Sequence, residues 1–258
     1  MGLGKILIRL AASVALLFGV MWAIPQLAPP VPEPYEGVQV LPPVSPKPTG
    51  STTAPPPLPP GFPSMNRPPP KIVVPDGQPQ PIASKFGWTY EIPAEWRNFS
   101  TGIAGWSNDG RSVVYGSIGD FGINYCPESD GSSLAMSGMT GRRGMDLHTA
   151  ALDAARGAEI IFGDDSAAPP RIEYSQPSDL EISGGPAVRY TVTATSMHKR
   201  TDCDPTEATF DVVAVPGFAT ATVAVFFVKL DLAIDGALNH SVVDDIISTL
   251  RHSDPQGR

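Results

Sequence analysis

The residues that could carry chemistry in this chain are few and scattered. Its four histidines, His148, His198, His240 and His252, stand singly, and none has a second ligand at metal-binding spacing. The sequence contains no G-x-S-x-G elbow, H-E-x-x-H helix, Walker loop or dinucleotide-binding fingerprint. We therefore predict no catalytic residues, no metal site and no cofactor. The alternative is a hydrolase or transferase whose active site follows no recognised pattern.

Cys126 and Cys203 are the two cysteines, and both lie beside turn-forming residues. An even count favours one disulfide if the domain lies in an oxidising compartment. No Cys-x-x-Cys motif is present to lower a thiol pKa. The bridge would close a loop of 77 residues and constrain the unfolded chain by about 4 kcal/mol in the entropic treatment.

Two basic clusters are candidate ligand contacts. They are Arg142 with Arg143, and His198 with Lys199 and Arg200. Either could hold an anionic envelope lipid or glycan, and ordinary surface charge is the alternative. Three aromatic side chains near predicted loops could line a pocket or belong to the core: Trp96, Trp106 and Phe121.

Acidic residues flank both cysteines. A disulfide could bring together Asp120, Glu128 and Asp130 with Asp202, Asp204 and Glu207. Oxygen ligands on adjacent loops suit calcium. We favour the alternative of solvated acidic loops.

The N-terminus has the character of an export signal. Lys5 and Arg9 precede the uncharged residues 10–24. Counted from Ile6, the apolar stretch reaches about 28 Å as a helix, enough to span a membrane when Arg9 extends to the headgroups. The residues around Ala23 and Ala28 make poor cleavage sites. We predict a single-pass signal anchor over residues 1–24 in the cell membrane, with the N-terminus cytoplasmic and the rest of the chain extracytoplasmic. Secretion after signal-peptide cleavage is the alternative.

Residues 25–83 form a predicted linker. They include 21 prolines in 59 residues, which prevents both helices and sheet ladders. We expect a disordered, largely polyproline II tether with a reach of up to about 180 Å. A docking role for its proline-rich stretches is the alternative.

Residues 84–258 form the predicted globular domain. Alternating apolar residues and turn signals predict strands over 86–92, 112–117, 122–125, 171–180 and 186–197, then a hairpin of 206–215 with 220–232. The last of these strands is apolar on both faces, as in a central strand. A helix is predicted from Asp146 or Thr149 to Gly163. A final helix is predicted after a cap at Asp235, with Leu238, Val242, Ile246 and Leu250 on one face. This order predicts an α+β domain, an antiparallel sheet packed with helices.

Two segments resemble a known family. They are WTYEIPAEW at residues 88–96 and ISTLR at residues 247–251. The chain resembles uncharacterised exported or membrane-anchored proteins of mycobacteria and related actinobacteria, whose domain is expected to be a PsbP-like α/β/α sandwich. The resemblance implies an actinobacterial envelope protein and an accessory or binding role. It supplies no catalytic residues, and the lipobox cysteine of lipid-anchored relatives is missing here.

The charge of the domain limits its partners. Residues 84–258 hold 13 basic and 23 acidic residues, and such a surface repels nucleic acids and anionic bilayers. We therefore predict a non-enzymatic binding or scaffolding module, tethered to the membrane through its N-terminal helix. Its expected partner is an envelope protein, lipid or glycan. A purely structural spacer is the remaining alternative.

Overall fold

The computed structural model describes residues 69–165, 167–217 and 221–253. The predicted signal anchor and residues 25–68 of the predicted linker lie outside the described residues. Within the described ranges, none of the helices has the length and apolar character that crossing a membrane would require.

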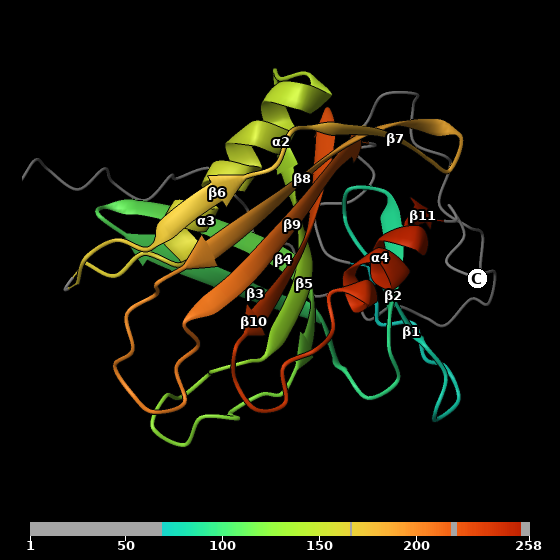
Figure 1. Cartoon of the computed structure of the whole chain (residues 1–258). Helices are drawn as coiled ribbons and strands as arrows, with labels where there is room; N and C mark the ends of the chain where they lie inside the picture. Colours follow the sequence, from blue (N-terminus) through green and yellow to red (C-terminus); the bar gives the residue numbers. More distant parts are fainter. Residues whose placement is uncertain (1–68, 166, 218–220, 254–258) are drawn as a thin grey trace, which may run out of the picture. The chain divides into compact units, whose positions relative to one another are not determined.

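A large antiparallel sheet forms the body of the domain (Figure 1). In spatial order its strands are β3 (Arg97–Asn108), β4 (Arg111–Phe121), β5 (Ala135–Arg142), β10 (Val223–Leu232), β9 (Glu207–Pro216), β8 (Gly185–Thr195) and β6 (Arg171–Tyr174). A further strand, β7 (Ser178–Ile182), also pairs with β8. β10 therefore lies between β5 and β9, although β5 and β10 are far apart in the sequence.

A small sheet packs on one side of the large one. It consists of β1 (Gln80–Ala83), β2 (Trp88–Ile92) and β11 (Arg251–His252), with β2 in the middle. Residues 80–83, which the sequence places at the end of the linker, thus pair with the first predicted strand of the domain.

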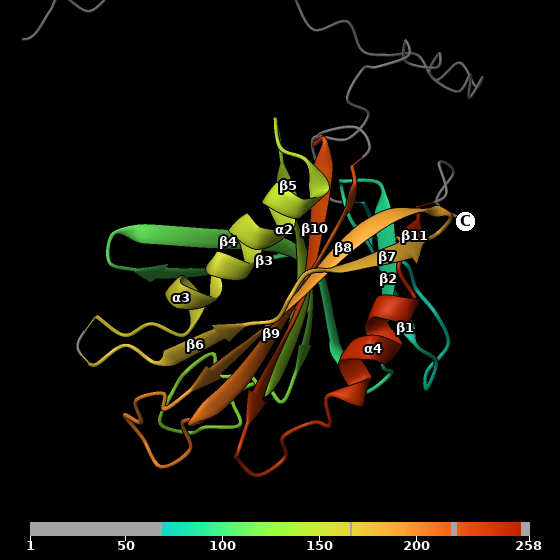
Figure 2. The same ribbon diagram turned by 45° about the horizontal axis from the view of Figure 1, so that its top comes forward.

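The central strands are buried on both faces. Phe210, Val212 and Phe227 face a core covered by the helices α2 (Leu147–Arg156) and α3 (Ala158–Ile161). Val213 and Phe226 face a second core, covered by the small sheet and by α4 (Ser241–Ser248). Figure 2 shows α2 and α3 on one side of the large sheet and α4 with the small sheet on the other. The prediction of an antiparallel sheet packed with helices is confirmed, as is the burial of β10 on both faces.

Several strand predictions were wrong in extent. β4 runs unbroken from Arg111 to Phe121, whereas residues 122–125 form a turn. The strands β3 and β5 were missed, because β3 alternates half-buried and exposed positions and β5 is rich in glycine and serine. The predicted strand over 171–180 is two strands, β6 and β7, interrupted before Ser178.

The helices also differ from prediction in their ends. Asp146 caps α2 as expected, and its side chain accepts a hydrogen bond from the Thr149 amide at 2.8 Å. The predicted single helix is divided at Gly157 into α2 and α3. The final helix begins at Ser241 after His240, not after Asp235, and its buried residues are Val243, Ile246 and Ile247.

A buried ionic cluster holds α4 against the large sheet. The Asp211 side chain has no exposed surface, and its Oδ1 accepts hydrogen bonds from Arg189 Nε and Nη2 at 3.0 and 2.6 Å and from Thr191 Oγ1. His240 Nε2 lies 2.9 Å from Asp211 Oδ2, and Arg189 Nη1 also donates to Asp244 at 2.6 Å. His240 and Asp244 belong to the start of α4, so this cluster fastens the helix to β8 and β9.

Candidate functional site

The candidate site is a polar hollow of about 260 Å³ beside the disulfide, which we call the disulfide hollow. Three loops contribute to its walls: 122–134 between β4 and β5, 162–170 after α3, and 196–206 between β8 and β9. The end of β10 and Trp106 of β3 complete it.

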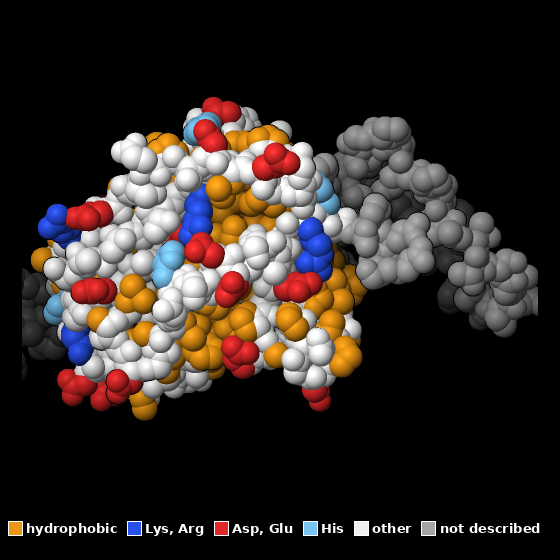
Figure 3. All heavy atoms as spheres, turned by 45° about the vertical axis from the view of Figure 1, so that its right-hand side comes forward, with side chains coloured by type: hydrophobic (Ala, Val, Ile, Leu, Met, Phe, Trp, Pro, Cys, Tyr) orange, Lys and Arg blue, Asp and Glu red, His pale blue; other side chains and the backbone are white. Residues whose placement is uncertain are grey.

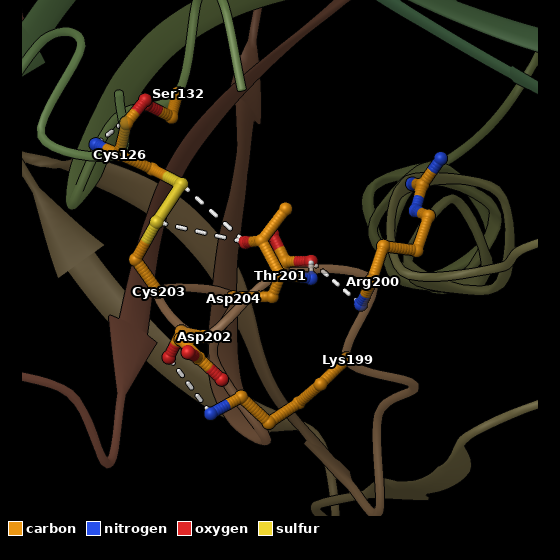
Figure 4. Close-up of a disulfide and its surroundings, with 8 residues drawn as sticks. All are labelled: Cys126, Ser132, Lys199, Arg200, Thr201, Asp202, Cys203 and Asp204. Carbon is orange, nitrogen blue, oxygen red and sulfur yellow. Dashed lines mark hydrogen bonds between the residues drawn. A yellow bond between two sulfur atoms is a disulfide. The ribbon is translucent and has the colours of Figure 1, made fainter. Parts of the chain in front are cut away.

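The disulfide joins two of these loops. Cys126 and Cys203 are bonded, with their Cα atoms 5.5 Å apart, as the sequence predicts. Figure 4 shows the hydroxyl of Thr201 directed at both sulfurs, with Oγ1 3.4 Å from the Sγ of Cys126 and 3.5 Å from that of Cys203. The Cys126 amide donates to Ser132 Oγ at 3.1 Å. The bridge therefore fixes two loops that are 77 residues apart.

The loop 196–206 is ordered by its own acidic residue. Asp204 Oδ2 accepts hydrogen bonds from the amides of Arg200 and Thr201, both at 2.8 Å. Lys199 Nζ donates to the carbonyl of Asp202 at 2.8 Å (Figure 4). These bonds within the loop set the directions in which its basic side chains leave the backbone.

An ion pair from β10 lies in the hollow. Lys229 Nζ is 2.8 Å from Asp231 Oδ1, and these side chains are only 12% and 7% exposed. Burial raises the pKa of Asp231, the nearby Lys229 ammonium lowers it, and the Asp204 carboxylate raises it further. A shifted carboxyl group inside a hollow is typical of a functional site.

A second ion pair lies in the hollow. Arg200 Nε lies 3.4 Å from Asp164 Oδ2, an acidic side chain that is 15% exposed. Tyr125 also lines the hollow, and burial together with the Asp231 and Asp204 carboxylates raises its pKa to about 12. The phenol therefore stays protonated at neutral pH and can both donate and accept hydrogen bonds.

The two predicted basic clusters do not come together at this site. His198 and Arg200 line the hollow, while Lys199 is engaged with Asp202. Arg142 instead donates from Nε to Asp153 of α2 at 2.8 Å, and Arg143 is exposed beside it. The structure thus separates Arg142 and Arg143, at the end of β5, from the hollow-lining pair.

The other candidate residues have mainly structural surroundings. Among the described residues no group of three or more His, Cys, Asp or Glu side chains is placed to hold a metal ion. Asp120 pairs with Arg97 at 3.0 Å. Trp96 is buried in the core and Phe121 packs against it, whereas Trp106 does line the hollow. His148 lies 3.1 Å from Asp179, and the His252 ring lies 4.3 Å from that of Trp88.

Sequence reasoning missed Lys229, Asp231 and Asp164. The first two were detectable, because they are the charged residues two apart in an otherwise apolar strand, and residues at i and i+2 share one face. Asp164 carries no such signal, since its place in the hollow depends on how the chain leaves α3.

The side of the domain that bears the small sheet also carries charged side chains. Figure 3 brings this side forward and shows basic side chains lying beside acidic ones, with apolar side chains gathered between them. A smaller, apolar hollow of about 150 Å³ lies elsewhere, next to Phe86, Ile103 and Met139. The disulfide hollow is the larger of these two and combines volume with ion-paired charges and shifted pKa values.

Comparison with known proteins gives one family match and several distant structural likenesses. Residues 70–255 match a family described as "Domain of unknown function (DUF8017)". No curated protein matches the chain.

The structural likenesses are weak. The cyanobacterial PsbP of Synechocystis is 11% identical, with a TM-score of 0.38 over 70% of this chain and 95% of its own. LpqN of Mycobacterium tuberculosis, described as involved in cell envelope biogenesis, is 13% identical, with a TM-score of 0.34 over 69% and 86%. A protein of unknown function from Pseudomonas aeruginosa is also 13% identical, with a TM-score of 0.32 over 64% and 92%. At this level of similarity, no activity or ligand transfers from these proteins to this chain.

Proposed function

The chain belongs to the DUF8017 family over residues 70–255, and from this premise we propose that its domain is a non-enzymatic binding module that holds an envelope ligand in the disulfide hollow. The observation that carries the proposal is that both loops joined by Cys126 and Cys203 line the same hollow. A covalent staple between two walls holds a site in one shape before the ligand arrives, which reduces the entropy lost on binding.

The position of the hollow supports a tethered module. In Figures 1 and 2 the loops 122–134 and 196–206 lie at the lower left, whereas β1 and β11, through which the described chain enters and leaves, lie at the right. The loops that line the hollow therefore lie apart from both ends of the described chain (Figures 1 and 2).

We include the membrane attachment in the proposal. Residues 1–24 would be a single-pass signal anchor and residues 25–79 the linker ahead of β1, with the domain outside the membrane. The charge pattern around residues 5–24 and the proline content of the linker support this arrangement. The actinobacterial origin and the PsbP-like classification belong to the same proposal, and they rest on the resemblance of residues 88–96 and 247–251.

Photo-crosslinking in living cells tests the proposal. A photoreactive amino acid replaces His198 in the full-length chain, which is expressed in an actinobacterium, and the products are identified by mass spectrometry of proteins, lipids and glycans. The matched control carries the same group at Glu181, which is exposed on β7 at a distance from the hollow.

We expect a discrete adduct at position 198, recovered with the membrane fraction, that is missing at position 181. Equal labelling at both positions, or none at either, would overturn the binding-module proposal. Conversion of the captured molecule by the purified chain would favour an enzyme instead.

A further inference from the structure

We propose that the ligand of the disulfide hollow is a saccharide, bound through one uncharged sugar ring. This inference rests on the proposed function, since it names the chemistry of the same site. Three properties of the hollow point to it: its size, the pairing of its charges, and the combination of aromatic with polar walls.

The size suits one ring. The hollow has a volume of about 260 Å³, just below the range of roughly 300–1,000 Å³ that is usual for small-molecule sites. A single sugar ring fits such a space, and the remainder of a longer glycan would extend into solvent. A lipid acyl chain would require a long apolar channel, whereas this hollow is bounded by the polar loops 122–134 and 196–206.

The charges favour an uncharged polar ligand. Both lysine and arginine side chains of the hollow are already ion-paired, Lys229 with Asp231 and Arg200 with Asp164. With Asp204, the hollow has more carboxylates than these two cations. A phosphate or sulfate group would therefore meet net repulsion, or would have to displace a carboxylate from its partner. A sugar hydroxyl donates to a carboxylate and accepts from an ammonium or guanidinium group, so it can bind to both members of a pair.

The walls of the hollow offer both aromatic surface and polar groups, which suit the C–H groups and the hydroxyls of a sugar ring. Trp106 and Tyr125 supply aromatic surface for the C–H groups of the ring. Trp106 is held in place because its ring packs 6.2 Å from those of both Tyr115 and Phe227, in edge-on contacts. The hydroxyl of Tyr125 adds a neutral hydrogen-bonding group.

Saturation-transfer NMR on the purified full-length chain tests the saccharide inference. The probes are glucose, galactose, arabinose, N-acetylglucosamine and trehalose, with inorganic phosphate and glucose 6-phosphate as anionic counterparts. Binding constants for any sugar that responds are measured by calorimetry.

Two variants at the hollow are compared with one control. Tyr125→Leu removes a polar aromatic wall, and Arg200→Gln removes the cation of a pair whose arginine is 70% exposed, so folding should tolerate it. Glu181→Gln is the matched control on β7. We expect at least one neutral sugar to bind, each hollow variant to weaken it about tenfold or more, and the control to leave it unchanged. The same sugar should reduce photo-crosslinking from position 198.

The outcomes separate the two proposals. If none of the sugars binds while position 198 captures a lipid or protein in cells, the saccharide inference is wrong and the hollow remains a binding site. Stronger binding of phosphate or glucose 6-phosphate than of glucose would also overturn it, because it would show that the paired cations accept an anion. If neither sugars bind nor adducts form, both proposals fall.

Discussion

Removal of the disulfide should cost the domain about 4 kcal/mol of unfolding free energy at 25 °C. The change is Cys126→Ser together with Cys203→Ser, which avoids leaving one free thiol. The magnitude follows from the sequence separation of 77 residues, because the loop-closure entropy lost from the unfolded chain grows with the logarithm of loop length. Since small domains are stable by only about 5–15 kcal/mol, this loss is about a quarter or more of the total.

Urea unfolding of the full-length chain, followed by tryptophan fluorescence, measures this difference. The serine variant should unfold at lower urea, and with a steeper slope, because its unfolded chain is free to expand. Wild-type protein in dithiothreitol should behave like the variant. The variant itself should not respond to the reductant.

Thr201→Val is the control. It removes the hydroxyl that contacts both sulfurs but keeps the covalent bond, so we expect a change within about 1 kcal/mol. A loss below about 1 kcal/mol in the serine variant would refute the reasoning. It would mean that the unfolded chain is compact without the bridge.

Three further predictions concern the charges and the core. Arg189→Met leaves the fully buried Asp211 carboxylate without its guanidinium partner. Urea unfolding should therefore show a loss of about 3–5 kcal/mol of unfolding free energy. A loss under about 1 kcal/mol would contradict the role of the cluster. Phe227→Ala, in the centre of the large sheet, should also lose about 3–5 kcal/mol of unfolding free energy. Its control, Ile103→Ala at a side chain 75% exposed, should change the unfolding free energy by no more than about 0.5 kcal/mol. Similar losses at both positions would contradict the burial of Phe227. Burial raises the pKa of Asp231, so the folded chain binds this proton more tightly than the unfolded chain does. The stability of wild type relative to Asp231→Asn should therefore rise as the pH falls from 7 through the folded pKa. It should level off below about 3.9, the pKa of the unfolded chain. A wild-type stability that falls relative to Asp231→Asn over this range would mean that Lys229 outweighs burial.

The parts of the fold that depend on local pattern could be predicted from the sequence. β2 and β10 have unambiguous apolar patterns, and Asp146 stands where an N-cap residue is required. β5 could not be predicted in this way, because its sequence AMSGMTGR has little strand propensity. It is a strand because Ala135–Arg142 pairs with β10 along its whole length. Tertiary pairing, not propensity, decides its conformation.

The site was predictable only in part for the same reason. The cysteine pairing follows from the even count, and His198 and Arg200 belong to one of the two basic clusters of an acidic domain. The hollow itself depends on how loops after β4, α3 and β8 converge, which one sequence does not encode in any local pattern. The separation of Arg142 and Arg143 from the other basic cluster has the same origin, since the extent of β5 determines where they lie.

The place of β10 in the large sheet determines the order in which the domain can assemble as it leaves a ribosome or a translocation channel. β5 and β9 are joined through β10, which lies between them. A nascent chain that ends before Val223 therefore contains two separate half-sheets, β3-β4-β5 and β9-β8-β6, with no strand to connect them. The small sheet is incomplete for longer, since β11 reaches β2 only with residues 251–252. Completion of the large sheet must then be a late event that follows emergence of nearly the whole chain, and such dependence on distant pairings makes folding slow.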